Sequence, residues 1–154
     1  MLLTEQLPIQ TKETPSREAI INNAPKRFSD FPVGSVSHQG DVIFVAIPTL
    51  PASAKPRTNR QVADGSTQGS RHVVERGDVY DGLPAEIVLL IRQATGCDVD
   101  ARYVGPVFVA PSDPTEHDVT HPEHGHQGFP AGTVVACAFQ RNLDAEQRER
   151  RTRD

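Results

Sequence analysis

The sequence predicts a mainly β (α+β) protein, built as a small strand-rich barrel or sandwich with one inserted helix and a short C-terminal helix. Thirteen prolines and 11 glycines interrupt the 154 residues too often for long helices. Short β-branched and aromatic runs alternate with turn residues, as in strands. Within the domain, only residues 83–94 carry apolar side chains at helical spacing. A chain of this length suits one modest core.

The chain divides into three predicted parts. Residues 1–39 are polar with scattered apolar side chains, and we expect a partly disordered N-terminal arm. Residues 40–141 form the compact β-rich domain. Residues 142–154 form a charged C-terminal helix or tail, where acidic residues come first and arginines follow, an order that suits the helix dipole.

The first strands of the domain follow from local composition. Residues 41–47 form a dense β-branched and aromatic run that ends at Pro48, which predicts a buried strand. Residues 60–63 and 71–75 read as two short strands around a polar, glycine-containing turn. We therefore expect a hairpin with a wide turn here.

The inserted helix is predicted over 83–94, with Pro84 in its first turn and Gly96 as its C-cap. Two short strands are expected next, at 101–104 and 107–110, separated by Gly105 and Pro106. Residues 111–132 are predicted to be a polar loop. Residues 133–139 then form a closing strand, because they are rich in valine and end in phenylalanine.

Composition excludes several classes of function. The 16 basic and 20 acidic side chains give a formal net charge of -4, so we expect no nucleic-acid partner. No run approaches the roughly 20 apolar residues of a membrane span, so we expect no membrane partner. Cys97 and Cys137 lack the CxxC spacing of zinc or redox sites and are expected to be buried free thiols. Since no basic segment followed by an apolar stretch is seen at the start of the sequence, we expect a cytoplasmic location.

The side chains that could bind a metal ion or take part in catalysis are most concentrated in one histidine-rich loop. His117, His121, His124 and His126 lie close together, among three carboxylates, Glu116, Asp118 and Glu123. Imidazole and carboxylate groups are the usual ligands of zinc, iron, manganese and nickel. Because proline and glycine interrupt this stretch, it is not the helical HExxH arrangement.

His72 begins a predicted strand and could meet His121 and His124 across the fold. We therefore predict His72, His121, His124 and His126 as ligands of a divalent metal such as zinc. The alternative is that these histidines are solvated, or that they hydrogen-bond to backbone groups and hold a long loop on the domain.

The order of short motifs resembles a group of uncharacterised small bacterial and bacteriophage proteins. The motifs are Gln39-Gly-Asp-Val42, Leu50-Pro51, Lys55-Pro56, the turn leading to His72, His121-Pro-Glu-His124, Pro130-Ala-Gly132 and Gln140-Arg141. The resemblance implies that His72, His121 and His124 are the histidines of the shared pattern. Ser70 departs from it, since the similar proteins carry a further histidine there, which His126 or His117 would have to replace.

Two functions remain open from the sequence. The first is a small accessory or structural protein of phage origin, which docks on a larger assembly through its N-terminal arm and lies in the cytoplasm or within a phage particle. The second is a histidine-ligated metal-binding module or a metal-dependent enzyme of the cupin-like type, with Glu123 or Glu116 as ligand or general base. A homo-oligomer is compatible with either function.

Overall fold

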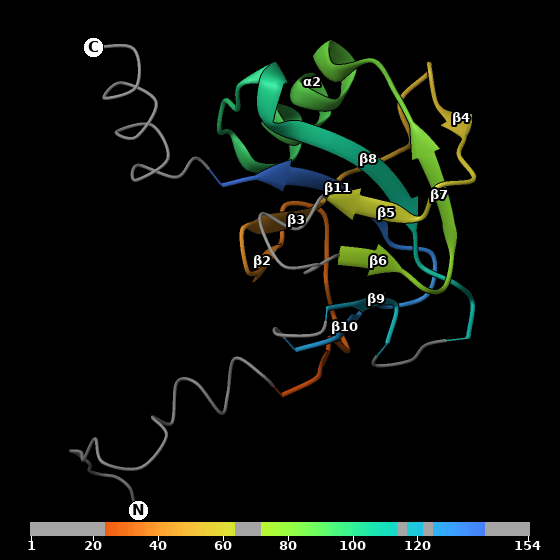
Figure 1. The fold of residues 1–154 in the computed structure, drawn as a ribbon. Helices are drawn as coiled ribbons and strands as arrows, with labels where there is room; N and C mark the ends of the chain where they lie inside the picture. The colour runs from red at the N-terminus through yellow and green to blue at the C-terminus, as the bar shows by residue number, and fades with distance from the viewer. Residues whose placement is uncertain (1–23, 64–71, 114–116, 122–124, 141–154) are drawn as a thin grey trace, which may run out of the picture.

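The computed structural model describes residues 24–63, 72–113, 117–121 and 125–140, and their strands form two sheets (Figure 1). The larger sheet has the order β2 (Val36–Gln39), β3 (Val42–Ala46), β11 (Val134–Phe139), β8 (Val104–Val109), β7 (Asp78–Asp81) and β4 (Lys55–Pro56). The smaller sheet has the order β1 (Lys26–Arg27), β10 (Gln127–Gly128), β9 (Val119–Thr120), β6 (His72–Val74) and β5 (Gln61–Ala63). The predicted mainly β, sandwich-like fold is confirmed.

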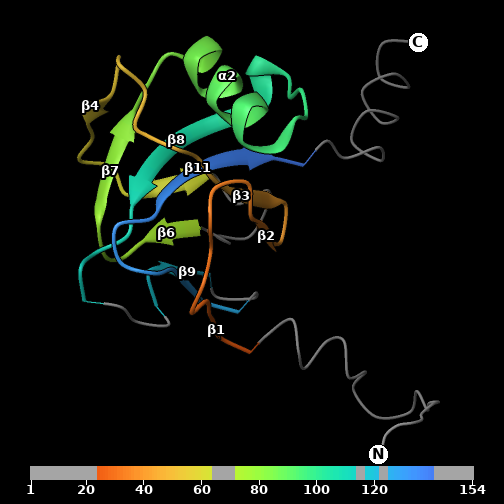
Figure 2. The same ribbon diagram turned by 180° about the vertical axis from the view of Figure 1, so that it is seen from behind.

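The molecule has three layers, because both faces of the central strands are covered. Helix α2 (Pro84–Thr95) lies on one face of the larger sheet and the smaller sheet lies on the other, as the front and rear views agree (Figures 1 and 2). Successive side chains of a strand point to opposite faces. Phe44 therefore packs into the core between the sheets, whereas Val45 packs under α2. This double burial explains the continuous apolar run of β3.

Phenylalanine rings dominate the core between the sheets. The ring of Phe129 lies 5.0 Å from that of Phe31, 5.5 Å from that of Phe28, and 5.7 Å from those of Phe44 and Phe108, measured between centroids. The contact with Phe28 is stacked and the other three are edge-to-face, and such contacts add to the free energy gained by burying the rings. Phe129 therefore fixes the chain that leaves the histidine-rich loop.

The predicted helix is confirmed as α2, with proline in its first turn and glycine as its C-cap, as expected. Pro84 occupies the first turn, and Gly96 adopts a left-handed conformation with φ of 77° while its N–H bonds to Arg92. The N-terminal cap comes from another loop: the Ser53 hydroxyl accepts the N–H of Leu83 at 2.8 Å and donates to Glu86 at 2.7 Å. Hydrogen bonds from the Ser53 hydroxyl and from the Ser53 backbone N–H lower the pKa of the Glu86 carboxyl.

The prediction of two separate strands at 101–104 and 107–110 is wrong, because the structure has a 3-10 helix followed by one continuous strand. Residues Ala101–Tyr103 form a 3-10 helix whose first turn is capped by the Asp100 carboxylate, and β8 then runs without a break through Gly105 and Pro106. Gly105 and Pro106 together lie opposite Cys137, because Val104 pairs with Ala138 and Val107 with Ala136. A bulge tolerates proline, since it leaves ladder positions unpaired.

Residues of the predicted arm and of the predicted loop also enter the sheets. Strands β1 and β2 lie within 1–39, and Phe31 is a core residue. Strands β9 and β10 lie within 111–132. Cys137 is buried as expected, but Cys97 is exposed. The expected helix over 142–154 and the first 23 residues lie outside the described ranges.

The remaining predicted strands are confirmed: β3 and β11 at 41–47 and 133–139, and the hairpin of β5 and β6, which pair in antiparallel fashion. No helix in the part of the chain that the structure describes is long and apolar enough to cross a membrane.

Candidate functional site

His72 and His121 form a contacting pair inside the domain. Strand β6 pairs with β9 in antiparallel register, with Val73 opposite Thr120, so the same register brings His72 opposite His121. The two ring centroids are 4.3 Å apart with the planes inclined by 46°. The residues are 5% and 3% exposed. Metal ions bind imidazole in its neutral form.

Gln39, the last residue of β2, holds the His72 ring from the opposite sheet. Its Nε2 donates to the backbone oxygens of Val119 at 3.1 Å and of Gly125 at 2.9 Å, and its Oε1 lies 2.9 Å from Nδ1 of His72. Both amide hydrogens are therefore used, and the amide oxygen can only accept. It follows that the neutral His72 ring carries its proton on Nδ1 and a lone pair on Nε2.

His126 has a different position in the loop. The backbone N–H of His121 donates to Nδ1 of His126 at 3.3 Å, and the His126 ring packs edge-on against His117, with centroids 5.0 Å apart. Because Nδ1 accepts this hydrogen bond, a neutral His126 ring carries its own proton on Nε2. This bond joins the residue that follows β9 to the residue that precedes β10.

The structure thus brings together His72 and His121 and places His126 beside the backbone of His121. His124, the fourth predicted ligand, lies outside the described residues, as do Glu116 and Glu123. Within 24–63, 72–113, 117–121 and 125–140, no three His, Cys, Asp or Glu side chains form a group that could hold a metal ion.

Two further buried polar residues were not predicted as site residues from the sequence. Gln39 is 1% exposed, and its only signal was its place at the start of the Gln39-Gly-Asp-Val42 motif. Asp118, just before β9, is fully buried, and its Oδ2 accepts the N–H of Phe129 at 2.8 Å. Burial raises the pKa of the Asp118 carboxyl. Its Oδ1 has no hydrogen-bond partner among the residues that the structure describes.

A family model described as "Domain of unknown function (DUF8820)" matches residues 38–137, a range that contains Gln39 and every predicted metal ligand. Neither the curated proteins nor the solved structures contain a match to the chain.

Proposed function

We propose that this chain, which belongs to the family described as "Domain of unknown function (DUF8820)", is a histidine-ligated metal-binding module centred on His72 and His121. The observation that carries the proposal is the orientation of His72 by Gln39. A histidine that binds a metal almost always donates its other ring N–H to an oxygen acceptor, which fixes the tautomer and the ring plane. The 2.9 Å contact between Nδ1 of His72 and Oε1 of Gln39 has this form.

The neighbouring His121 ring supplies a second nitrogen ligand at the same place. Its centroid lies 4.3 Å from that of His72, so both rings are close enough to contact one ion. Two imidazole ligands favour a borderline divalent cation such as zinc, which takes at least one further protein ligand in most sites.

We assign the third ligand position to His124 ahead of His126. His126 would have to give up the hydrogen bond from the His121 N–H before its Nδ1 could bind a metal ion. His124 belongs to the His121-Pro-Glu-His124 motif that the sequence singled out, and its role stays a prediction because it lies outside the described residues.

The test is zinc binding by the full chain, measured by isothermal titration and by metal content after dialysis. We expect about one zinc ion per chain, with binding lost in His72→Ala and in His121→Ala. His38→Ala is the matched control, because His38 is exposed and should not affect binding. Thermal melting without metal shows whether each variant is folded. No zinc uptake by the unaltered chain, or unchanged uptake by both folded site variants, would contradict the proposal.

The two broader expectations remain predictions. A metal-dependent reaction would require Glu116 or Glu123, which lie outside the described ranges. Docking on a larger assembly would use the N-terminal arm, residues 1–39, of which residues 1–23 lie outside the described ranges. A cupin-like enzyme would further need an open coordination position for water or substrate.

A further inference from the structure

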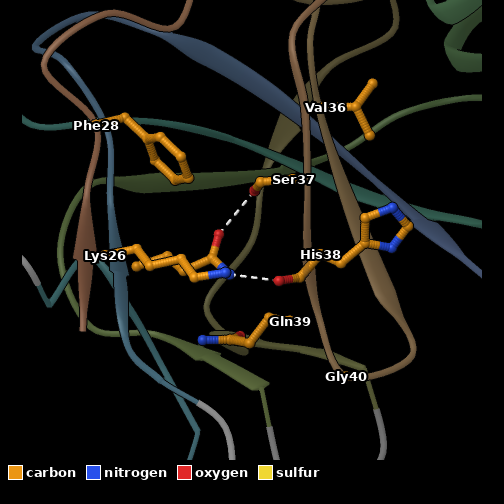
Figure 3. Close-up of a pocket in the computed structure, with 8 residues that line it drawn as sticks. Lys26, Phe28, Val36, Ser37, His38, Gln39 and Gly40 are labelled. Atoms are coloured by element: carbon orange, nitrogen blue, oxygen red, sulfur yellow. Dashed lines mark hydrogen bonds between the residues drawn. The ribbon is translucent and has the colours of Figure 1, made fainter. Parts of the chain in front are cut away.

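A groove lies at one corner of the domain, between strand β1 of the smaller sheet and strand β2 of the larger sheet (Figure 3). Its cavity volume is about 480 Å³, which is within the range of pockets that hold small organic molecules. The buried side chain of Gln127 reaches into it from β10. The groove is therefore large enough for a small ligand, and the groups that face it determine the chemistry of that ligand.

Strand β2 turns main-chain groups toward the groove, because the side chains of Val36 and His38 point away from it (Figure 3). Ser35 accepts the N–H of Ala46 in β3, so the N–H of Val36, which shares a trans peptide with the Ser35 C=O, points away from β3. The C=O of His38 accepts Nε2 of Gln127 at 2.6 Å, and the N–H of a strand residue lies on the same side as its C=O. Among the described strands, β2 pairs only with β3, so both N–H groups are available as donors.

Gln127 places a further donor at the groove. Its Oε1 accepts the Ser37 hydroxyl at 2.7 Å, and its Nε2 donates one hydrogen to the C=O of His38 (Figure 3). A side-chain amide has two such hydrogens, and the second has no acceptor among the residues that the structure describes. Because Gln127 is 2% exposed, an acceptor bound in the groove would satisfy a donor on a buried side chain.

The wall on the β1 side carries one positive charge and one aromatic ring. Lys26 and Phe28 are two residues apart in an extended segment, so their side chains lie on the same face. The Phe28 ring packs on those of Phe31 and Phe129 in the core between the sheets, so this face is directed toward the larger sheet. Lys26 has no ion pair with a carboxylate among the described residues, and no carboxylate lines the groove.

We propose that this groove binds a small organic carboxylate that carries a flat apolar group. A carboxylate only accepts hydrogen bonds, and the groove offers it donors, which are the Lys26 ammonium, the second amide hydrogen of Gln127 and the N–H groups of Val36 and His38. Hydrogen bonds between ionised groups are the strongest of these. The Phe28 ring provides an apolar surface for the rest of the ligand. Neither histidine of the pair lines the groove, so this site goes beyond the proposed metal-binding function and does not depend on it.

The test is an NMR titration of the full, metal-free chain with benzoate as the probe and with benzyl alcohol as its uncharged counterpart. Benzoate has few atoms, so we expect a dissociation constant in the millimolar range. The shifts should saturate and should be largest at the main-chain amides of Val36 and His38 and at the side-chain amide of Gln127. Benzyl alcohol should bind more weakly by about tenfold or more, because it lacks the charge that pairs with Lys26.

Lys26→Met removes the charge and keeps an apolar stem in the groove. We expect the affinity for benzoate to fall by about tenfold or more in this variant. Lys55→Met is the matched control, because Lys55 is exposed on β4, at the other end of the larger sheet from β2, and it should bind benzoate as the unaltered chain does. Unchanged amide signals of the core residues Phe44 and Ala136 show that each variant is folded.

Three outcomes would overturn the proposal. The first is the absence of saturable shifts at the groove in the unaltered chain. The second is equal binding of benzoate and benzyl alcohol, or the same loss of benzoate affinity in both lysine variants. The third is a set of shifts centred on His72 and His121, which would place the carboxylate at the histidine pair. Zinc uptake is measured separately, so the failure of carboxylate binding and the failure of zinc binding are distinguishable.

Discussion

The side-chain oxygen of Gln39 lies 2.9 Å from Nδ1 of His72. This contact joins the end of β2 in the larger sheet to the start of β6 in the smaller sheet. The same amide holds the backbone of Val119 and Gly125 on either side of His121. One buried glutamine therefore links the two sheets, orients one histidine and anchors the loop that carries the other.

Replacement of Gln39 by leucine should affect both stability and metal binding. Three buried partners would lose their hydrogen bonds, and each unsatisfied group costs about 1–3 kcal/mol, so we expect a loss of roughly 3 kcal/mol or more in the free energy of unfolding. Zinc affinity should fall by about 10- to 100-fold, as for other residues that orient metal ligands. Urea denaturation and zinc titration measure the two effects. Gln93→Leu, on the exposed face of α2, is the control, and equal stability of the two variants would contradict the prediction.

The buried carboxyl of Asp118 should make stability depend on pH. Burial raises its pKa above the ordinary value of 3.8. A raised pKa contributes stability that is complete below the ordinary value and is lost as the pH rises through the raised value. The free energy of unfolding of Asp118→Asn, compared with that of the unaltered chain, should therefore depend less on pH in this acidic window.

Urea denaturation at several values between about pH 4 and about pH 7 checks this prediction. Asp113→Asn is the control, because the side chain of Asp113 is 86% exposed. The same pH profile in both variants would show that Asp118 does not carry the effect.

Ser53 should stabilise α2 from outside the helix. Its hydroxyl is the acceptor for the N–H of Leu83, which has no side-chain cap within the helix. We expect Ser53→Ala to lower the free energy of unfolding by about 1 kcal/mol, the usual cost of a lost N-cap. Thermal melting followed by circular dichroism measures the change. Ser112→Ala, at an exposed loop position, should have no effect, and a similar decrease in that control would refute the assignment.

A comparison of alanine substitutions at Gly77 and Gly132 should distinguish the cost of backbone strain from the cost of a steric clash. Gly77 and Gly132 both have positive φ, 98° and 78°, but only Gly77 faces a neighbour, since an added Cβ would collide with the backbone oxygen of Val109. We expect Gly132→Ala to cost about 1 kcal/mol, from the left-handed conformation alone. Gly77→Ala should cost about 3 kcal/mol or more, because β7 and β8 would have to separate. Equal losses in chemical denaturation would argue against the close approach.

Several elements could be predicted because their signals are local. The apolar spacing of α2, with Pro84 and Gly96 at its ends, does not depend on the rest of the fold. The runs of β3 and β11 are buried on both faces, so every position is apolar. By contrast, β1, β9 and β10 have two residues each, too few for any periodicity, and they exist only because neighbouring strands pair with them.

The bulge in β8 is a second case in which local sequence signals did not predict the structure. Gly105 and Pro106 are strand breakers by local rules, and the prediction of two strands followed those rules. The continuous strand depends on β11, where the ring of Phe139 lies where a Cβ on Gly105 would be. Pairing with a partner distant in sequence therefore overrode the local signal.

The sequence by itself determined the mainly β class, the helix at Pro84–Thr95 and the candidate histidines, because composition and short motifs are properties of neighbouring residues. Only the tertiary structure decided which histidines meet and which tautomer His72 adopts, because Gln39, His72 and His121 are far apart in the chain. The register of β6 with β9 brings the two rings together, and the packing of the larger sheet on the smaller one brings the amide of Gln39 to them. A buried hydrogen-bond network of this kind is specified by three-dimensional contact and leaves no periodic pattern in the sequence.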